Sequence, residues 1–167
     1  RAIPEEDPFV GREIQAAVSI PGMAKARMAE SAALELLNDP VRELAALEDA
    51  LAIARKARSK VAESLALINL ADIRLRRRQY AEALDLSRRS LALAREFDDA
   101  GAMATSKANM GFALFGLGRT AEGKRLADDA LADYERTGAT AEIASLLGEY
   151  SQYLERAGDY KMALAAI

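Results

Sequence analysis

The sequence predicts an all-α fold in which antiparallel helical hairpins stack in series. Three observations predict it: a repeat with a period of 40 residues, a composition that favours helices, and short turn-forming links at regular intervals. Asn69-Leu70-Ala71 recurs as Asn109-Met110-Gly111, and Ala81-Glu82-Ala83 recurs as Ala121-Glu122-Gly123. A fixed period between about 20 and 50 residues is typical of repeat proteins, in which each unit packs mainly against its neighbours.

The composition limits the possible fold classes and the possible functions of the chain. Apolar residues make up 51% of the chain and aromatic residues only 5%, while alanine and leucine are among the strongest helix formers. The net charge of −3 gives no general attraction to nucleic acid or to anionic membranes. The chain contains neither cysteine nor histidine, which excludes disulfides, thiolate metal sites and histidine-based catalysis. We therefore expect no cofactor, no metal and no nucleic-acid partner.

The chain shows no sign of a membrane segment or a signal peptide. Residues 1–8 are acidic and proline-rich and lack the apolar core of a signal peptide. No apolar run approaches the roughly 18 residues that a membrane-spanning helix needs. A cytoplasmic location without membrane insertion follows by default. The chain begins without methionine and stops inside a helical pattern, so we expect it to be part of a longer protein.

The predicted elements follow one another at short intervals. Residues 1–22 form an N-terminal segment with a short helix over 9–19, which Pro21-Gly22 is expected to end. Residues 23–167 form the repeat domain, with units at about 23–59, 60–100, 101–140 and a shortened 141–167. The expected helices of this domain cover residues 23–37, 41–57, 61–77, 81–97, 102–117, 121–136, 141–156 and 160–167.

Capping and turn residues mark the ends of these helices. Asp39 is a plausible N-cap, with Pro40 at the first helical position. Links of three or four residues between later helices force neighbouring helices to pack antiparallel. Gly118 and Gly158 stand where the end of a helix needs a left-handed residue. Arg78 occupies the same place in the preceding unit, so it either accepts a steric cost or ends its helix differently.

Small residues recur in phase where paired helices must approach closely. Ala71, Gly111 and Ser151 share one position on the first helices of successive hairpins, and Ala83, Gly123 and Ala163 share one on the second helices. With Tyr80 and Tyr160 at the turns, this pattern resembles the tetratricopeptide repeat. The 40-residue unit resembles the long form found in kinesin light chains and bacterial signalling regulators. The resemblance implies a right-handed superhelical solenoid.

The chain departs from the family pattern in several places. The early tryptophan position of the repeat reads Leu67, Lys107 and Leu147, and the closing proline is missing. Glu43 replaces the small residue seen at Ala83, so we expect the first unit to pack more loosely or differently.

The resemblance also implies where a partner binds, because the first helices of such hairpins line a concave face that holds extended peptides. Asn69 and Asn109 share a position from which a carboxamide could bond the backbone of a guest. The alternative is simple inheritance of the repeat or a bond to the neighbouring helix. Phe112 and Phe115 could anchor an apolar side chain, with a role in the core as the alternative. The predicted partner-binding residues are Asn69, Asp72, Arg76, Asn109, Phe112, Phe115, Gln152 and Arg156.

A basic cluster and an apolar C-terminal stripe are two further candidate contact areas. The basic cluster Arg74, Arg76, Arg77 and Arg78 could grip an acidic segment or a phosphate, but cations at the end of a helix are already favoured by its dipole. At the other end, Tyr160, Ala163, Leu164 and Ile167 would present an apolar stripe that predicts self-association, as a homodimer.

These features predict a protein–protein interaction module of a larger, bacterial signalling protein. The module would bind a peptide or a partner domain, or mediate self-association, and would not itself be an enzyme. The alternative is a structural spacer or dimerisation stalk whose groove holds no ligand.

Overall fold

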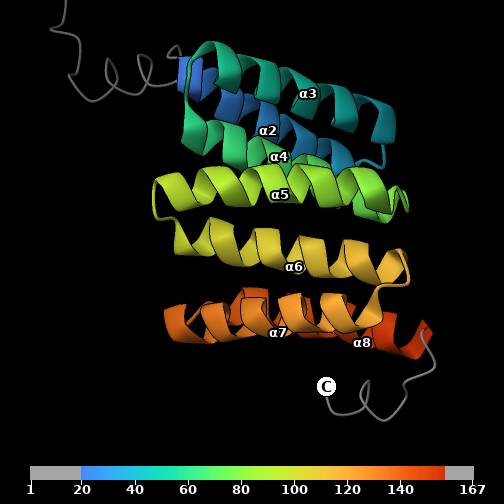
Figure 1. Cartoon of the computed structure of the whole chain (residues 1–167). Helices are drawn as coiled ribbons and strands as arrows, with labels where there is room; N and C mark the ends of the chain where they lie inside the picture. Colours follow the sequence, from blue (N-terminus) through green and yellow to red (C-terminus); the bar gives the residue numbers. More distant parts are fainter. Residues whose placement is uncertain (1–19, 157–167) are drawn as a thin grey trace, which may run out of the picture. The chain divides into compact units, whose positions relative to one another are not determined.

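The computed structural model describes residues 20–156, which form seven helices and no strand (Figure 1). The first helices of the hairpins begin at residues 20, 60, 100 and 140 and the second helices at 40, 80 and 120, so the hairpin repeats every 40 residues. The predicted all-α fold is confirmed. The expected helices over 9–19 and 160–167 lie outside the described residues. The seven helices are α2 (Ile20–Leu36), α3 (Pro40–Lys56), α4 (Lys60–Arg76), α5 (Tyr80–Glu96), α6 (Ala100–Gly116), α7 (Thr120–Thr137) and α8 (Thr140–Arg156).

The predicted boundaries agree with these helices to within two residues, except at the start of α2. Pro21-Gly22 was expected to end a preceding helix, but the pair lies in the first turn of α2, and the expected start at Met23 is three residues late. Proline is tolerated there because the first backbone N–H groups of a helix have no helical acceptor. The predicted cap of α3 is present: Asp39 Oδ1 accepts from Arg42 N at 3.2 Å, and Pro40 is the first helical residue.

The chain forms two compact units, Arg1–Ala66 and Leu67–Ile167. Within the first unit, α2 packs against α3, and a small core gathers Ala24, Ala54 and Ala62 with the half-buried Ile53. Glu43 is almost wholly buried in α3, with 3% of its surface exposed. It occupies the position that small residues hold in the later hairpins.

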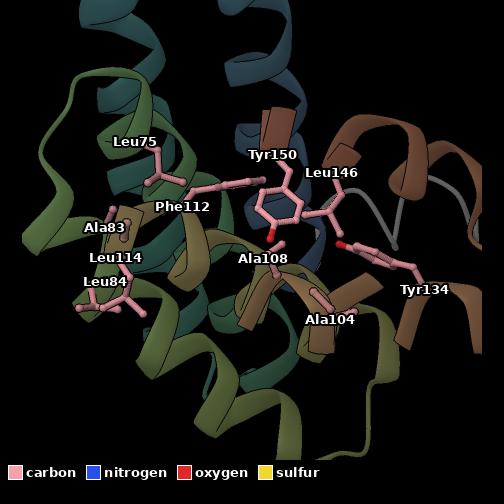
Figure 2. Packing of buried hydrophobic residues seen from close by; sticks show 13 residues of the cluster. Leu75, Ala83, Leu84, Ala104, Ala108, Phe112, Leu114, Tyr134, Leu146 and Tyr150 are labelled. Carbon is pink, nitrogen blue, oxygen red and sulfur yellow. The ribbon is translucent and has the colours of Figure 1, made fainter. Parts of the chain in front are cut away.

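Within the second unit, α5, α6 and α7 run one beneath the next, and α8 packs against α7 and α6 (Figure 1). The core between them combines many alanines with a few large side chains, so the helices lie close together (Figure 2). Buried serines supplement it, since Ser106 Oγ on α6 donates to Ser90 Oγ on α5 at 3.0 Å. The buried core residues are Leu75, Ala83, Leu84, Ala104, Ala108, Phe112, Ala113, Leu114, Ala127, Ala130, Tyr134, Leu146 and Tyr150.

Each turn between the described helices contains one residue in the left-handed region of backbone space. The N–H of the residue after it bonds a carbonyl in the last turn of the preceding helix, and at all these turns except that of Asp98 its own N–H does so too, as in Gly118 N to Phe115 O at 3.0 Å and Arg119 N to Leu114 O at 2.9 Å. Arg78 makes the same pair of bonds with a φ of 59°, so its helix ends in the same way as the others and accepts the steric cost. The predicted Gly158 lies outside the described residues. The left-handed residues are Asn38, Arg58, Arg78, Asp98, Gly118 and Gly138.

The close approach predicted from the small residues is present between α6 and α7. A Cβ added at Gly111 would lie 3.0 Å from the carbonyl oxygen of Gly123, and one added at Gly123 would lie 2.8 Å from that of Gly111. Only glycine leaves room for the two backbones to meet at this distance. Gly116 has a related role, because a Cβ there would overlap the ring of Tyr80. The equivalent Ala163 lies outside the described residues.

Gly111→Ala is expected to lower the free energy of unfolding by about 1–3 kcal/mol, because the added methyl group meets backbone atoms that cannot move aside. Gly148→Ala is the matched control, since a Cβ there meets nothing within 4 Å. Alanine in place of an exposed helical glycine is expected to add up to about 1 kcal/mol. Urea unfolding followed by circular dichroism measures both. A Gly111→Ala variant as stable as the parent chain would contradict the close approach.

Arg78→Gly is expected to stabilise the chain by about 1 kcal/mol, because glycine adopts the left-handed conformation without the steric cost that a side chain incurs. Gly118→Ala tests the reverse change at the equivalent turn and should lose a similar amount. The readout is the midpoint of thermal unfolding. Arg78 would be shown to make a compensating contact if its replacement by glycine lowered that midpoint.

Candidate functional site

The face formed in the second unit by α4, α6 and α8 carries the residues predicted to bind a partner. Asn69, Arg76 and Gln152 are exposed, and Asp72 is half-buried. Asn109 and Phe112 are buried instead. Phe115 is half-buried, and the side chain of Arg156 lies outside the described part of the chain.

The two equivalent asparagines have different surroundings. Asn109 has 8% of its surface exposed and lies against α4, where its Nδ2 reaches the Ile68 carbonyl oxygen at 3.5 Å. This contact corresponds to the interhelical bond that was the alternative to guest binding. Asn69 remains exposed on α4. The two carboxamides therefore do not form a continuous row of accessible donors and acceptors.

The two phenylalanines pack against tyrosines of α8. The rings of Phe112 and Tyr153 stack with centroids 5.2 Å apart and an angle of 13° between their planes. Phe115 stacks on Tyr150 at 5.5 Å and on Tyr153 at 5.7 Å. Offset stacking of this kind strengthens apolar packing. These aromatic contacts join α6 to α8. They correspond to the role in the core that was the alternative to anchoring a guest's apolar side chain.

The remaining polar groups of this face are acidic or already paired. Asp72 forms an ion pair with Arg76 at 3.0 Å along α4. Glu149 on α8 stands where Asn69 and Asn109 stand in earlier hairpins. Desolvation by the surrounding protein raises the pKa of the Glu149 carboxyl, and the nearby Asp72 carboxylate raises it further. A hydrogen bond with Ser145 lowers it in part. The carboxylates of Asp72 on α4 and Glu149 on α8 are therefore close enough to repel each other.

The basic cluster at the end of α4 is held by neighbouring side chains. Arg74 Nη1 donates to Gln79 Oε1 at 2.9 Å, and the Arg74 guanidinium pairs with Glu82 at 3.3 Å. These contacts tie the last turn of α4 to the first turn of α5. The arrangement agrees with cations placed at a helix C-terminus rather than with an assembled anion site.

A groove of about 410 Å³ lies among α5, α6 and α7. Its apolar part is formed by the buried Leu91 and Leu114 and the half-buried Met110 and Leu126. Charged side chains from all three helices surround this apolar part. The remaining lining residues are Arg88, Ala92, Arg95, Lys107, Glu122, Arg125 and Asp129.

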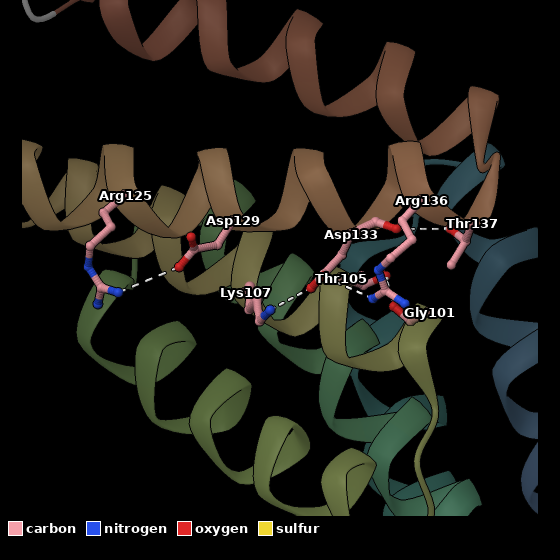
Figure 3. Close-up of polar contacts among 8 residues, drawn as sticks. All are labelled: Gly101, Thr105, Lys107, Arg125, Asp129, Asp133, Arg136 and Thr137. Carbon is pink, nitrogen blue, oxygen red and sulfur yellow. Dashed lines mark hydrogen bonds and ion pairs between the residues drawn. The ribbon is translucent and has the colours of Figure 1, made fainter.

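Most charges around the groove are paired (Figure 3). Lys107 pairs with Asp133 at 2.5 Å, and Arg125 pairs with Asp129 at 3.5 Å. Glu122 pairs with Arg119 at 2.7 Å. Within the described residues, Arg88 and Arg95 form no ion pair, and both are exposed on α5.

The Lys107–Asp133 pair links α6 to α7 beside the groove (Figure 3). Burial acts to raise the pKa of the Asp133 carboxyl, but hydrogen bonds from Lys107 and Arg136 outweigh it and hold that pKa below its ordinary value. Tyr134 Oη donates to Thr105 Oγ1 at 2.8 Å between the same two helices. Polar contacts therefore fix α7 on α6 next to the apolar part of the groove.

Sequence reasoning did not find this groove, although a signal was present. Arg88, Leu91 and Arg95 recur at spacings of three and four residues and therefore share one face of α5. The equivalent positions one repeat later hold Asp128 and Glu135. One repeat earlier, Arg55 matches Arg95 while Glu48 stands at the position of Arg88, so it is the combination of the two arginines that is particular to this hairpin.

Residues 20–156 contain neither a metal-binding cluster nor a membrane-spanning helix. No group of three or more acidic, histidine or cysteine side chains could hold a metal ion there. None of the helices in that range combines the length and the apolar character needed to cross a membrane.

The sequence has no match among protein-family models or among curated proteins. Solved structures do match, among them the crystal structure of the apo form of RapI, with a TM-score of 0.71 and 16% sequence identity. The match covers 95% of this chain and 44% of the RapI chain. At this identity the likeness shows a shared fold alone, and the chain spans less than half the length of RapI.

Asp133→Asn is expected to lower the free energy of unfolding at pH 7 by about 1–2 kcal/mol, because it removes a charge-assisted acceptor from Lys107. Since folding depresses the pKa of Asp133, its stabilising effect is fully present above the unfolded-state pKa of about 3.9 and is lost as the pH falls through the lower folded value. The stability difference between the parent chain and the variant should therefore be constant from pH 5 to 8, a range chosen to lie above about 3.9. It should shrink in more acidic solution. A constant difference down to the most acidic pH at which the chain still folds would contradict this assignment.

Proposed function

We propose that this chain is a protein–protein interaction module that holds a peptide or a partner domain against its stacked helical hairpins. We also propose that its repeats belong to the long form of the tetratricopeptide family. The 40-residue spacing of the hairpins and the glycine contact at the helix crossing support that assignment. The module acts by binding rather than by catalysis, since the chain lacks histidine and cysteine.

The observation that carries the proposal is the groove among α5, α6 and α7. Its volume of about 410 Å³ falls within the roughly 300–1,000 Å³ typical of ligand sites. It combines apolar side chains with a charged border, as interface cores and rims do. The exposed Asn69 and Gln152 of the α4–α6–α8 face are a second candidate contact area.

The wider setting is proposed on the family resemblance. The module would work in the cytoplasm as part of a longer bacterial signalling protein and would hold two copies of that protein together. The residues predicted for self-association, Tyr160, Ala163, Leu164 and Ile167, lie outside the described part of the chain, so that contact remains a prediction.

A structural spacer is the second candidate function. Asn109 and Phe112, predicted to face a guest, are buried against other helices. A face closed in this way would suit a rigid connector. The spacer and the binding module differ in whether any ligand recognises a defined part of the surface.

Selection of a displayed random-peptide library on the folded chain tests the proposal. Enriched peptides are then measured against Ala92→Trp, which places an indole in the groove, and against Ala132→Trp, the equivalent exposed position on α7 outside the groove. An Asn69→Ala/Gln152→Ala variant tests the other face. We expect peptides that bind the parent chain and Ala132→Trp but lose affinity for Ala92→Trp or for the double variant.

The spacer interpretation would replace the proposal under either of two results. In the first, no peptide is enriched over a selection on an unrelated helical protein. In the second, every enriched peptide binds all variants equally. Circular dichroism of each variant checks that the helices remain folded.

A further inference from the structure

We propose that the groove among α5, α6 and α7 binds an acidic amphipathic helix of a partner protein, with Arg88 and Arg95 receiving two of its carboxylates. The inference rests on the proposed binding function and adds the chemistry and the conformation of the partner. It concerns a surface away from the α4–α6–α8 face on which the repeat resemblance places a guest.

The charges of the groove complement those of an acidic partner. The groove is bordered by three internal ion pairs, Lys107–Asp133, Arg125–Asp129 and Arg119–Glu122, and Asp133 also pairs with Arg136. Of the basic residues in the lining, Arg88 and Arg95 form no ion pair within residues 20–156. The chain as a whole has a net charge of −3, so this positive site stands against an acidic background.

The charge of Arg88 is felt across the groove on α7. The pKa of Glu122 on α7 is held below its ordinary value chiefly by the hydrogen bond from Arg119, while burial acts in the opposite direction. Arg125 and, from α5, Arg88 lower it further by charge. A partner's carboxylate placed beside Arg88 on the α5 side, away from Glu122 and Asp129, would experience the same kind of attraction.

The groove also favours a helical partner over an extended one. The walls of the groove are helices, whose central backbone N–H and C=O groups are already bonded within each helix. An incoming strand would find no backbone partners, so addition of a β-strand is excluded here. A helix satisfies its own backbone and can place an apolar stripe on Leu91, Met110 and Leu126. The flexible thioether of Met110 can adapt to the side chains that arrive.

The spacing of Arg88 and Arg95 determines the spacing expected for the acidic residues of the partner helix. Arg88 and Arg95 are seven residues apart on α5, which corresponds to about 10.5 Å along the helix axis. A helix lying alongside α5 matches both with Asp or Glu residues that are seven positions apart. Its apolar residues would fall between them at spacings of three and four, facing the groove.

The lining favours this partner over a nucleic acid. Glu122 and Asp129 lie in the same groove and would repel a continuous chain of phosphates. The apolar part has no aromatic side chain on which a base could stack. Two separated carboxylates on an apolar helix avoid both problems.

Binding of two designed helical peptides tests the proposal by fluorescence anisotropy. Each is an alanine-based helix of about 18 residues, long enough to be partly helical in isolation. One carries leucines at spacings of three and four with glutamates seven residues apart, and the other replaces those glutamates with lysines. The chain is used in its parent form, as Arg88→Glu/Arg95→Glu, and as the control Arg58→Glu/Arg78→Glu. The control changes two exposed turn arginines that do not line the groove.

The glutamate peptide should bind the parent chain and the control equally and bind the Arg88→Glu/Arg95→Glu variant about tenfold more weakly, because two favourable contacts become repulsive. The lysine peptide should show the opposite preference and bind the Arg88→Glu/Arg95→Glu variant best. Added salt should weaken the binding of both, since charges at the border are screened over about 8 Å at physiological ionic strength.

Three results would overturn the proposal. The glutamate and lysine peptides could bind the parent chain equally, the control could lose as much affinity as the groove variant, or a labelled single-stranded oligonucleotide could displace the glutamate peptide. Peptides from the library selection separate this proposal from the broader one. Groove-dependent peptides that ignore Arg88 and Arg95 would leave the binding module intact and remove only the acidic helix.

Discussion

The contact between Gly111 and Gly123 is the constraint on which the α6–α7 hairpin depends. It lets two helix backbones meet without side chains between them, and alanines make up much of the surrounding core. Close approach leaves little space in the core for large apolar groups, and its aromatic members are Phe112, Tyr134 and Tyr150. The stability of the second unit therefore comes from many short contacts rather than from a few bulky ones.

The same geometry determines where the groove lies. On the other side of α6, Asn109 is buried against α4 and Phe112 stacks on α8, so neither side chain is available to a partner. Where α5 and α7 stand on either side of α6, longer side chains such as Leu91, Met110 and Leu126 leave a groove between them. The Lys107–Asp133 and Tyr134–Thr105 contacts hold the two helices beside it in place. The groove is thus a consequence of packing helices whose side chains differ in size.

Sequence reasoning recovers the parts of the fold that depend on local and periodic features. The 40-residue period, Asp39 as a cap, Gly118 as a left-handed turn residue and the small residues at the crossing all act within a hairpin or between adjacent hairpins. The buried state of Asn109 and Phe112 could not be derived in this way, because it depends on where α4 and α8 lie relative to α6. The groove was missed for the same reason: its lining comes from three helices, and no single helix shows it.

The left-handed residue found at each turn gives the chain a constant step. Since each helix and its turn together occupy 20 residues, gain or loss of a 40-residue segment would preserve the direction of every later helix. A 20-residue change would reverse them all. Arrays built on such a step can lengthen by duplication, because each new junction between hairpins is made by the same kinds of residues as the existing ones. Arg88 and Arg95 on α5, set against Asp128 and Glu135 one step of 40 later, show how copies of one unit can then diverge in charge without altering the scaffold.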